Sequence, residues 1–395
     1  MILSKRTVIS ILISTFFFNT IGMAIFTYIP PYLRALGNKE FIIPLVSSIF
    51  PLTATIFPSL LGKRSDLIQN RSVFFIIGTI GTSLTLLLLL ITKELIWIII
   101  LLFLYGFFNA CFGLIFILYQ ELVENNPKFI SYYNAMIVLG WFAGSLFGGI
   151  YINFYGIMNI LFFLLLASVI NIILLLFIKE DRKMIFEHYN LRSNQEENND
   201  IEQNRSKFIS KSIYYALFFR NFGVRPVMAI LAILMEDLLI NATQIGFLIG
   251  FNPLLQFFLM ILIGKLINDK NQKNIMIIGY LLSAITLFGY IVSIDFNGFL
   301  FYQILASFSY AMFWNATQIY IAQRTTPKNK GKYVGYANSS FFLGSFIGGI
   351  LFSFLSYNQN NNSDYYFAMW FMVIFPAISA LIIFLKFKNK ENLEL

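Results

Sequence analysis

The sequence predicts an all-α membrane protein with twelve transmembrane helices in two pseudo-symmetric six-helix bundles. Its 395 residues are 58% hydrophobic and 12% charged, with a mean hydropathy of +0.73. That composition leaves too little polar surface to cover a soluble globule of this length. The apolar runs are about twenty residues long, as in membrane-spanning helices, and lack the ten-residue alternation of a barrel. A motif also returns about two hundred residues later, which predicts the duplication.

The internal repeat is clearest in two glycine-rich stretches. Residues 144–150 read GSLFGGI and residues 344–350 read GSFIGGI. Further residues recur at similar spacing: Pro127 and Tyr133 return as Pro327 and Tyr333, and Pro51 and Gly62 return as Pro253 and Gly264. Two homologous membrane halves in the same orientation, each with an even number of spans, are typical of secondary transporters.

Twelve runs avoid charge for about 18 residues or more, the length that predicts a spanning helix. They are residues 8–35, 41–61, 73–92, 95–120, 131–153, 156–178, 212–237, 243–264, 274–294, 298–322, 333–356 and 365–385. We therefore expect an N-terminal bundle over 1–179, a cytoplasmic linker over 180–210 and a C-terminal bundle over 211–395. The linker is rich in acids and asparagine and holds the only histidine, His188, which argues against a proton-relay role for this residue.

The lysines and arginines gather on one side of this layout. They cluster in residues 5–6, 63–71, 179–211, 265–273, 324–332 and 386–390, whereas Arg34, Lys39 and Lys93 fall on the other side. Basic residues collect in cytoplasmic loops, so both termini are predicted to be cytoplasmic in a multi-pass protein of the plasma membrane. The formal charge of +9 then reflects topology and is poor evidence for nucleic-acid binding. The expected partners are the lipid bilayer and a small molecule, and we expect a monomer.

Residues 62–71, at the end of the second predicted span, carry a recognisable motif. Gly62, Ser65, Asp66 and Arg71 resemble the signature of the major facilitator superfamily between its second and third helices, although its second glycine is missing near Gln69. The matching stretch of the second half keeps Gly264 but has Asn268 in place of the acid. With the twelve spans, the repeat and the linker, the resemblance covers essentially the whole chain. The pattern at residues 30–37, PPYLRALG, is nearest to drug-efflux members.

The motif predicts a cytoplasmic gate. The Asp66 carboxylate at a helix end suits the positive N-terminal dipole of another helix, such as the one starting near Lys332. The resemblance implies that Arg71 pairs with Glu121 or Glu124, which would hold the two halves closed on this side. The alternative is a solvated turn with surface ion pairs worth about 0 to 1 kcal/mol.

Two glycine clusters have the four-residue spacing that lets helix backbones approach closely. They are Gly140, Gly144, Gly148 and Gly149 in the fifth span and Gly344, Gly348 and Gly349 in the eleventh. We expect these helices to meet partners from the opposite half. The alternative for the fifth span is the antiporter signature of drug-efflux members, but Ser145 replaces its proline.

The resemblance implies that the first, fourth, seventh and tenth helices line a central cavity. The polar residues at mid-depth in these helices are the candidate substrate contacts: Asn19, Asn109, Asn221, Arg225, Trp314, Asn315 and Gln318, supplemented by Trp141 and Gln256 from neighbouring helices. Trp314 and Gln318 share a helix face at a spacing of four residues.

Arg225 stands out because an arginine near the bilayer centre costs about 2.5 to 3.5 kcal/mol on insertion scales. We expect it to face a wet cavity or a partner, with Pro226 bending its helix and freeing a carbonyl. The two hypotheses are a contact to an anionic or polar substrate group and a structural arginine bonded to backbone carbonyls. Arg220, nearer the cytoplasm, is expected to snorkel or to line the vestibule.

No aspartate or glutamate lies at mid-depth in any predicted span, so proton coupling is in doubt and facilitated diffusion or exchange stays open. The fourth span also has Leu102 where family members carry an arginine four residues before Gly106. The sequence thus favours a secondary transporter of a neutral-polar or anionic small organic solute by alternating access. The alternatives are a proton-coupled multidrug efflux antiporter and a non-transporting membrane sensor. We expect no enzyme, cofactor or metal site, and a packing role for Cys111.

Overall fold

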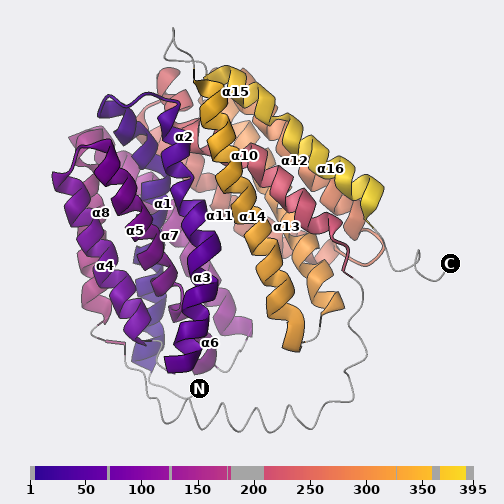
Figure 1. Cartoon of the computed structure of the whole chain (residues 1–395), viewed down its shortest axis with the longest axis horizontal. Helices are drawn as coiled ribbons and strands as arrows, with labels where there is room; N and C mark the ends of the chain where they lie inside the picture. The colour runs from indigo at the N-terminus through magenta and orange to yellow at the C-terminus, as the bar shows by residue number, and fades with distance from the viewer. Residues whose placement is uncertain are drawn as a thin grey trace. The chain divides into compact units, whose positions relative to one another are not determined.

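The computed structural model describes residues 5–68, 72–123, 127–175, 177–178, 209–325, 327–357 and 365–387, and all regular structure in these ranges is helical (Figure 1). The first half comprises α1 (Lys5–Ala35), α2 (Ile42–Ser47), α3 (Ile49–Ile68), α4 (Ser72–Ile91), α5 (Leu95–Phe112), α6 (Ile115–Leu122), α7 (Pro127–Tyr155), η1 (Ile157–Asn159) and α8 (Ile160–Leu175). The second comprises α10 (Ser212–Asp237), α11 (Ala242–Leu266), α12 (Gln272–Val292), α13 (Phe296–Arg324), α14 (Pro327–Ser356), α15 (Tyr365–Met372) and α16 (Ile374–Lys386). The predicted all-α membrane fold is confirmed.

Eleven helical segments of the described chain are long and apolar enough to cross a membrane. The predicted tenth span, α13, is not among them, although its 29 residues extend roughly 43 Å at 1.5 Å per residue. Polar side chains such as Gln303 and Asn315 lower its hydropathy. Since α13 packs against both α11 and α12, these side chains face protein instead of lipid.

Three predicted spans are divided in the structure. The span expected at 41–61 forms α2 and α3 with a turn at Ser48, and the span expected at 365–385 forms α15 and α16 around Val373. Pro51 and Pro376 lie just inside the second helix of each pair, and a proline cannot donate to the carbonyl four residues earlier. The span expected at 95–120 is divided into α5 and α6 by a turn at Gly113.

Contacts divide the chain into two compact units. Unit 1 holds Met1–Ile25 and Thr53–Asn204, and unit 2 holds Phe26–Leu52 and Arg205–Leu395. Unit 2 thus contains a segment of the first sequence half, the end of α1 with α2 and the start of α3. The division at the linker 180–210 stays a prediction, and residues 179–208 lie outside the described ranges.

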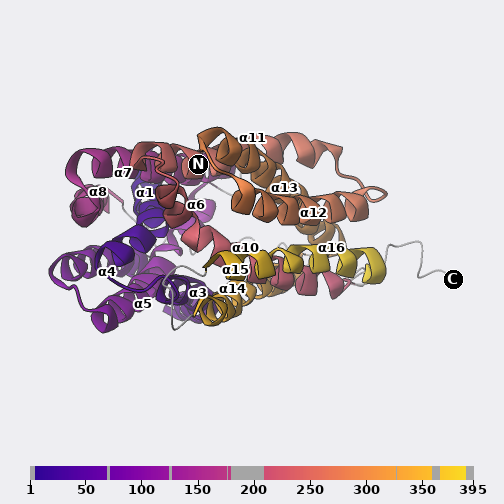
Figure 2. The same ribbon diagram turned by 90° about the horizontal axis from the view of Figure 1, so that it is seen from above.

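The sequence repeat reappears as a repeated helix contact within each unit. In unit 1, a Cβ atom on Gly78 of α4 would lie 2.5 Å from the Phe112 backbone nitrogen of α5. In unit 2, a Cβ atom on Gly279 of α12 would lie 2.7 Å from the Phe313 nitrogen of α13. Helix α12 also packs against α16 (Figure 2). Glycines at corresponding positions of the two halves, about two hundred residues apart, therefore bring corresponding pairs of helix backbones together.

Four glycines of the two clusters approach the first helix of their own half, while α14 also packs against α2 of the other sequence half, as expected for the eleventh span. A Cβ atom on Gly144 of α7 would lie 2.2 Å from the Thr20 carbonyl oxygen of α1, and Gly140 faces Phe16 one turn earlier. In unit 2, Cβ atoms on Gly344 and Gly348 of α14 would lie 2.2 and 2.1 Å from the Phe218 and Phe222 carbonyl oxygens of α10. Close approach to the first helix of the same half explains this spacing.

Gly349 is the described exception. A Cβ atom there would lie 2.7 Å from the Ser48 Cβ and 3.1 Å from the Pro44 oxygen of α2, so this glycine does meet a segment of the other sequence half, inside unit 2. Gly148 and Gly149 of α7 are buried.

Candidate substrate site

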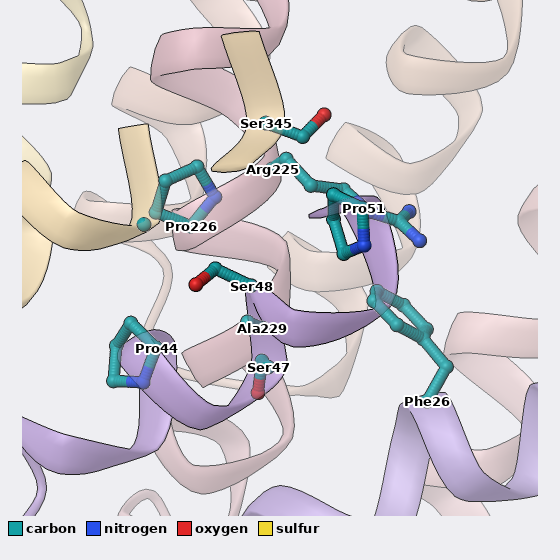
Figure 3. A pocket seen from close by; sticks show the side chains of 10 residues that line it. Phe26, Pro44, Ser47, Ser48, Pro51, Arg225, Pro226, Ala229 and Ser345 are labelled. Atoms are coloured by element: carbon teal, nitrogen blue, oxygen red, sulfur yellow. The ribbon is translucent and has the colours of Figure 1, made fainter. Parts of the chain in front are cut away.

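Helix α10 carries two candidate residues of unit 2, Asn221 and Arg225, and Arg225 lies halfway along it. Beside Arg225 is a small cavity of about 10 Å³ (Figure 3), room for about one water. It is lined by Phe26, Pro44, Ser47, Ser48, Pro51, Arg225, Pro226, Ala229, Ser345 and Gly349. Residues of α1, α2, α3, α10 and α14 therefore surround one point at the middle of α10.

The Arg225 guanidinium rests on an aromatic ring. Its Cζ lies 4.1 Å from the centroid of the Phe26 ring, and Figure 3 shows the side chain extending toward Phe26 and Pro51. Among the described residues it makes no hydrogen bond and no ion pair. A cation–π contact contributes about 0.5 to 2 kcal/mol, less than the roughly 2.5 to 3.5 kcal/mol cost of placing this charge at mid-membrane. The charge is therefore only partly compensated.

Pro226 does not interrupt α10, which is continuous from Ser212 to Asp237. It does remove a donor for the Phe222 carbonyl, four residues earlier. That carbonyl oxygen is the atom that a Cβ on Gly348 would meet. The expectation that a freed carbonyl faces protein is therefore met by a glycine of α14, which permits a weak Cα–H···O contact.

Arg220 is buried, and the expectation that it snorkels or lines a vestibule is wrong. Its Nε donates to the Ser283 Oγ at 3.1 Å, and its Nη1 donates to the Asn221 Oδ1 at 3.0 Å. Its Cζ lies 4.5 Å from the centroid of the Phe313 ring. Ser283 in turn shares a hydrogen bond of 2.6 Å with Ser309. Arg220 therefore holds α10 to α12 and α13, and Asn221 is partly used in doing so.

Tyr310 of α13 is a residue that the sequence interpretation missed. Its ring centroid lies 5.9 Å from the Arg220 Cζ and 5.9 Å from the ring of Trp314. The sequence did contain an indication of this role, because Tyr310 lies four residues before Trp314 and therefore on the same helix face.

The other candidates of unit 2 divide between packing and partial exposure. Asn315 donates through Nδ2 to the Met260 carbonyl of α11 at 2.7 Å, so its amide serves helix packing. Trp314 contacts the Phe341 ring at 5.5 Å. Gln256 is buried and Gln318 is half-buried.

In unit 1 the structure brings two of the three candidates together. The Trp141 Nε1 donates to the Asn19 Oδ1 at 3.1 Å, and the Asn19 Nδ2 donates to the Thr15 carbonyl at 2.8 Å. Asn109 is half-buried on α5 and interacts with the Tyr105 hydroxyl. Asn19 and Trp141 thus form one polar element joining α1 to α7.

The predicted cytoplasmic gate is described only in part. A Cβ atom placed on Gly62 would meet nothing within 4 Å, and Ser65 is fully buried. The side chains of Asp66 and Glu121 lie outside the described part of the chain, as do Arg71 and Glu124 altogether. In the second half, the Asn268 Oδ1 accepts hydrogen bonds from the backbone nitrogens of Lys270 and Asn271, so this asparagine closes a turn.

The chain matches the family model described as Major Facilitator Superfamily over residues 11–212 and again over residues 212–394. The chain belongs to the major facilitator superfamily. The two matches meet at the repeat boundary, and the predicted resemblance is confirmed. Members of this family are multi-pass membrane transporters, so the chain is a transporter-family protein with the expected fold.

Relatives and solved structures agree with the family. An uncharacterized MFS-type transporter of Methanocaldococcus jannaschii is 25% identical over 360 residues, covering 89% of this chain and 91% of the relative. The quinolone resistance protein NorA of Staphylococcus aureus is 26% identical over 143 residues, 35% of this chain and 37% of its own. The crystal structure of the nucleoside transporter NupG superposes with a TM-score of 0.76 at 15% identity, covering 98% of this chain and 100% of that one, which shows the fold alone.

Proposed function

We propose that this chain is a secondary transporter that moves a small anionic or neutral-polar organic solute by alternating access. It acts in the plasma membrane with both termini in the cytoplasm, as a monomer and without a cofactor or metal. The distribution of lysine and arginine along the sequence supports this orientation. The family supports transport, and the substrate class rests on Arg225.

The only partly compensated charge of Arg225 is the observation that carries the substrate class. A guanidinium at mid-helix that lacks a hydrogen bond and an ion pair among the described residues favours a ligand that supplies negative charge or acceptor oxygens. Every acidic residue of the chain lies outside the middle of a predicted span, so the helices offer Arg225 no carboxylate at its own depth. A cationic solute would meet repulsion at this position.

The surroundings of Arg225 suit a ligand with an apolar body. Phe26 lies against the guanidinium, and Tyr310 and Trp314 present neighbouring rings on one face of α13. Aromatic faces supply most of the contact area in small-molecule sites, while a few polar groups fix orientation. Arg220 is already hydrogen-bonded to Ser283, so its role is to position α10. Asn19, Asn109, Trp141, Gln256 and Gln318 remain candidate contacts.

At the cytoplasmic side, we assign Asp66, Arg71, Glu121 and Glu124 to a gate that closes when the substrate site opens outward. The support is the motif at residues 62–71 together with the family.

A thermal-shift screen with paired compounds tests the substrate class. Purified protein is heated with carboxylates or phosphates and with their uncharged amide or dephosphorylated analogues. At least one anion should raise the melting temperature while its neutral analogue raises it less. Arg225→Ala should abolish that shift and the uptake of the same compound into proteoliposomes. Lys270→Ala, which removes an exposed charge of the same unit, is the control that should retain both. Unchanged uptake in Arg225→Ala would remove this residue from the site.

The second candidate is proton-coupled multidrug efflux. The partial match to the quinolone resistance protein NorA and the pattern at residues 30–37 favour it. Dye efflux from cells producing the chain, collapsing on addition of a protonophore, would decide for this function. Dye retention would decide against it.

A further inference from the structure

One cluster of charges in unit 2 joins a first-half helix to a second-half helix. Arg34, in the last turn of α1, bonds through Nη1 to the Asp237 Oδ1 at 2.5 Å and lies 3.7 Å from the Glu236 Oε2. Its Nη2 lies 3.1 Å from the Glu40 Oε1. The Tyr365 hydroxyl of α15 donates to the other Asp237 oxygen at 2.6 Å. We call Arg34, Glu40, Glu236 and Asp237 the latch.

The two helices that form the latch end in the same backbone motif. In α1, the nitrogens of Gly37 and Asn38 donate to the carbonyls of Arg34 and Leu33; Gly37 has a φ of +84°. In α10, the nitrogens of Leu239 and Ile240 donate to Glu236 and Met235; Leu239 has a φ of +59°. This motif ends a helix and fixes its last turn. A cation is favoured at that end of the helix dipole and an anion is disfavoured, so Glu236 and Asp237 depend on Arg34.

The latch contains more negative than positive charge. Within the described chain, three carboxylates surround a single guanidinium, so full ionisation leaves a net charge of −2. Nearby, Lys39 is exposed, and the rings of Tyr365 and Tyr366 of α15 stack on each other. Glu40 is the most buried acid at 9% exposure, and its Oε2 has no hydrogen-bond partner among the described residues. A buried, unpartnered carboxylate oxygen is costly, and adding a proton removes that cost.

We propose that Glu40 is the proton-binding site of this latch, and that protonation of Glu40 from the external side holds the Arg34–Asp237 pair closed. The proposal goes beyond transport of a solute and rests on the alternating-access cycle only for the motion that parts the segment 26–52 from α10. A hollow of about 220 Å³ lined by Pro31, Arg34, Ala35 and Glu236 gives water and protons access to the cluster.

The direction of the pH effect follows from the burial of Glu40. Burial raises the pKa of the Glu40 carboxyl; Arg34 opposes this effect and Asp237 adds to it. When the latch parts, Glu40 becomes solvated and loses that shift. The closed latch therefore binds a proton more readily than the open one, so acid favours closure. This contribution is complete below the ordinary carboxyl pKa and is lost as the pH rises through the raised value.

Maleimide labelling measures the opening of the latch without any substrate. Cys111, the single cysteine, is replaced by alanine, and Ala229→Cys is introduced. Ala229 is 5% exposed and lies on α10 between Arg225 and Asp237, so a membrane-impermeant reagent reaches it from outside only when the segment 26–52 has moved away. Lys39→Cys, exposed in either state, is measured in parallel, and the ratio of the two rates removes the pH dependence of the thiol itself.

Lowering the external pH from 8 to 5.5 should reduce the rate ratio by about twofold, and the ratio should fall further as the pH approaches the ordinary carboxyl pKa, below which the effect is complete. Glu40→Gln, which mimics the protonated acid, should give a low ratio at both pH values, and Arg34→Gln a high ratio at both. A Glu40→Gln protein that keeps the pH dependence, or a parent ratio that rises in acid, would overturn the proposal. Because no ligand is present, the outcome is independent of Arg225, and Glu40→Gln decides even if Arg34→Gln fails to fold.

Discussion

Substitution of Gly348 by alanine tests how closely α14 approaches α10. The new Cβ would lie 2.1 Å from the Phe222 carbonyl oxygen and 2.8 Å from the Phe222 C and Cα atoms. Carbon and oxygen atoms in such contacts are normally separated by about 3.3 Å or more, so the helices must part by roughly 1 Å. All three atoms belong to the backbone and cannot rotate away. Overpacking of this kind costs about 1 to 3 kcal/mol.

Gly335→Ala is the matched control on the same helix, because a Cβ at Gly335 would meet nothing within 4 Å. Helix propensity alone favours alanine there by up to about 1 kcal/mol. Tryptophan fluorescence of the purified protein during heating gives an apparent melting temperature. At about 2 to 4 °C per kcal/mol for a unit of this size, Gly348→Ala should lower it by roughly 2 to 12 °C, while Gly335→Ala leaves it unchanged or higher. Equal melting temperatures for Gly348→Ala and the parent would refute the close approach.

Two further predictions concern stability in the same heating assay. A left-handed backbone conformation costs a non-glycine residue about 1 to 2 kcal/mol. Leu239→Gly should therefore raise the melting temperature, and Gly37→Ala should lower it. A lower melting temperature for Leu239→Gly together with a higher one for Gly37→Ala would mean that neither turn is strained. Ser283→Ala should destabilise the protein by about 1 to 2 kcal/mol, because the Nε–H group of buried Arg220 loses its acceptor. A Ser283→Ala protein as stable as the parent would show that Arg220 finds another partner.

The span pattern could be predicted from sequence because lipid imposes a simple rule on composition. A run of about twenty apolar residues has to satisfy its backbone internally, so all twelve predicted spans overlap helices of the structure. The helix interruptions at Ser48 and Val373 were not predicted. A proline that removes one backbone donor leaves the hydropathy of the run unchanged, so the hydropathy pattern gives no sign of it. The polar helix α13 was predicted as a span, yet its packing against two neighbours explains why it can be less apolar.

The partners of individual side chains could not be predicted to the same degree. Arg220 was expected near water, but Ser283, which anchors it, lies 63 residues further along the chain on another helix. The spacing of Gly344 and Gly348 predicted that another helix packs closely against this helix face, but it did not identify that helix. Nothing in the sequence connects Arg34 with Asp237, since each appears only as a charge at the end of an apolar run.

Uptake into proteoliposomes of the compound that most stabilises the protein tests the central claim, that the chain carries a polar or anionic solute past Arg225. The account predicts saturable uptake that is lost in Arg225→Ala and retained in Lys270→Ala. Binding of that compound without any uptake by the parent protein would contradict it and would favour a sensor with a transporter fold.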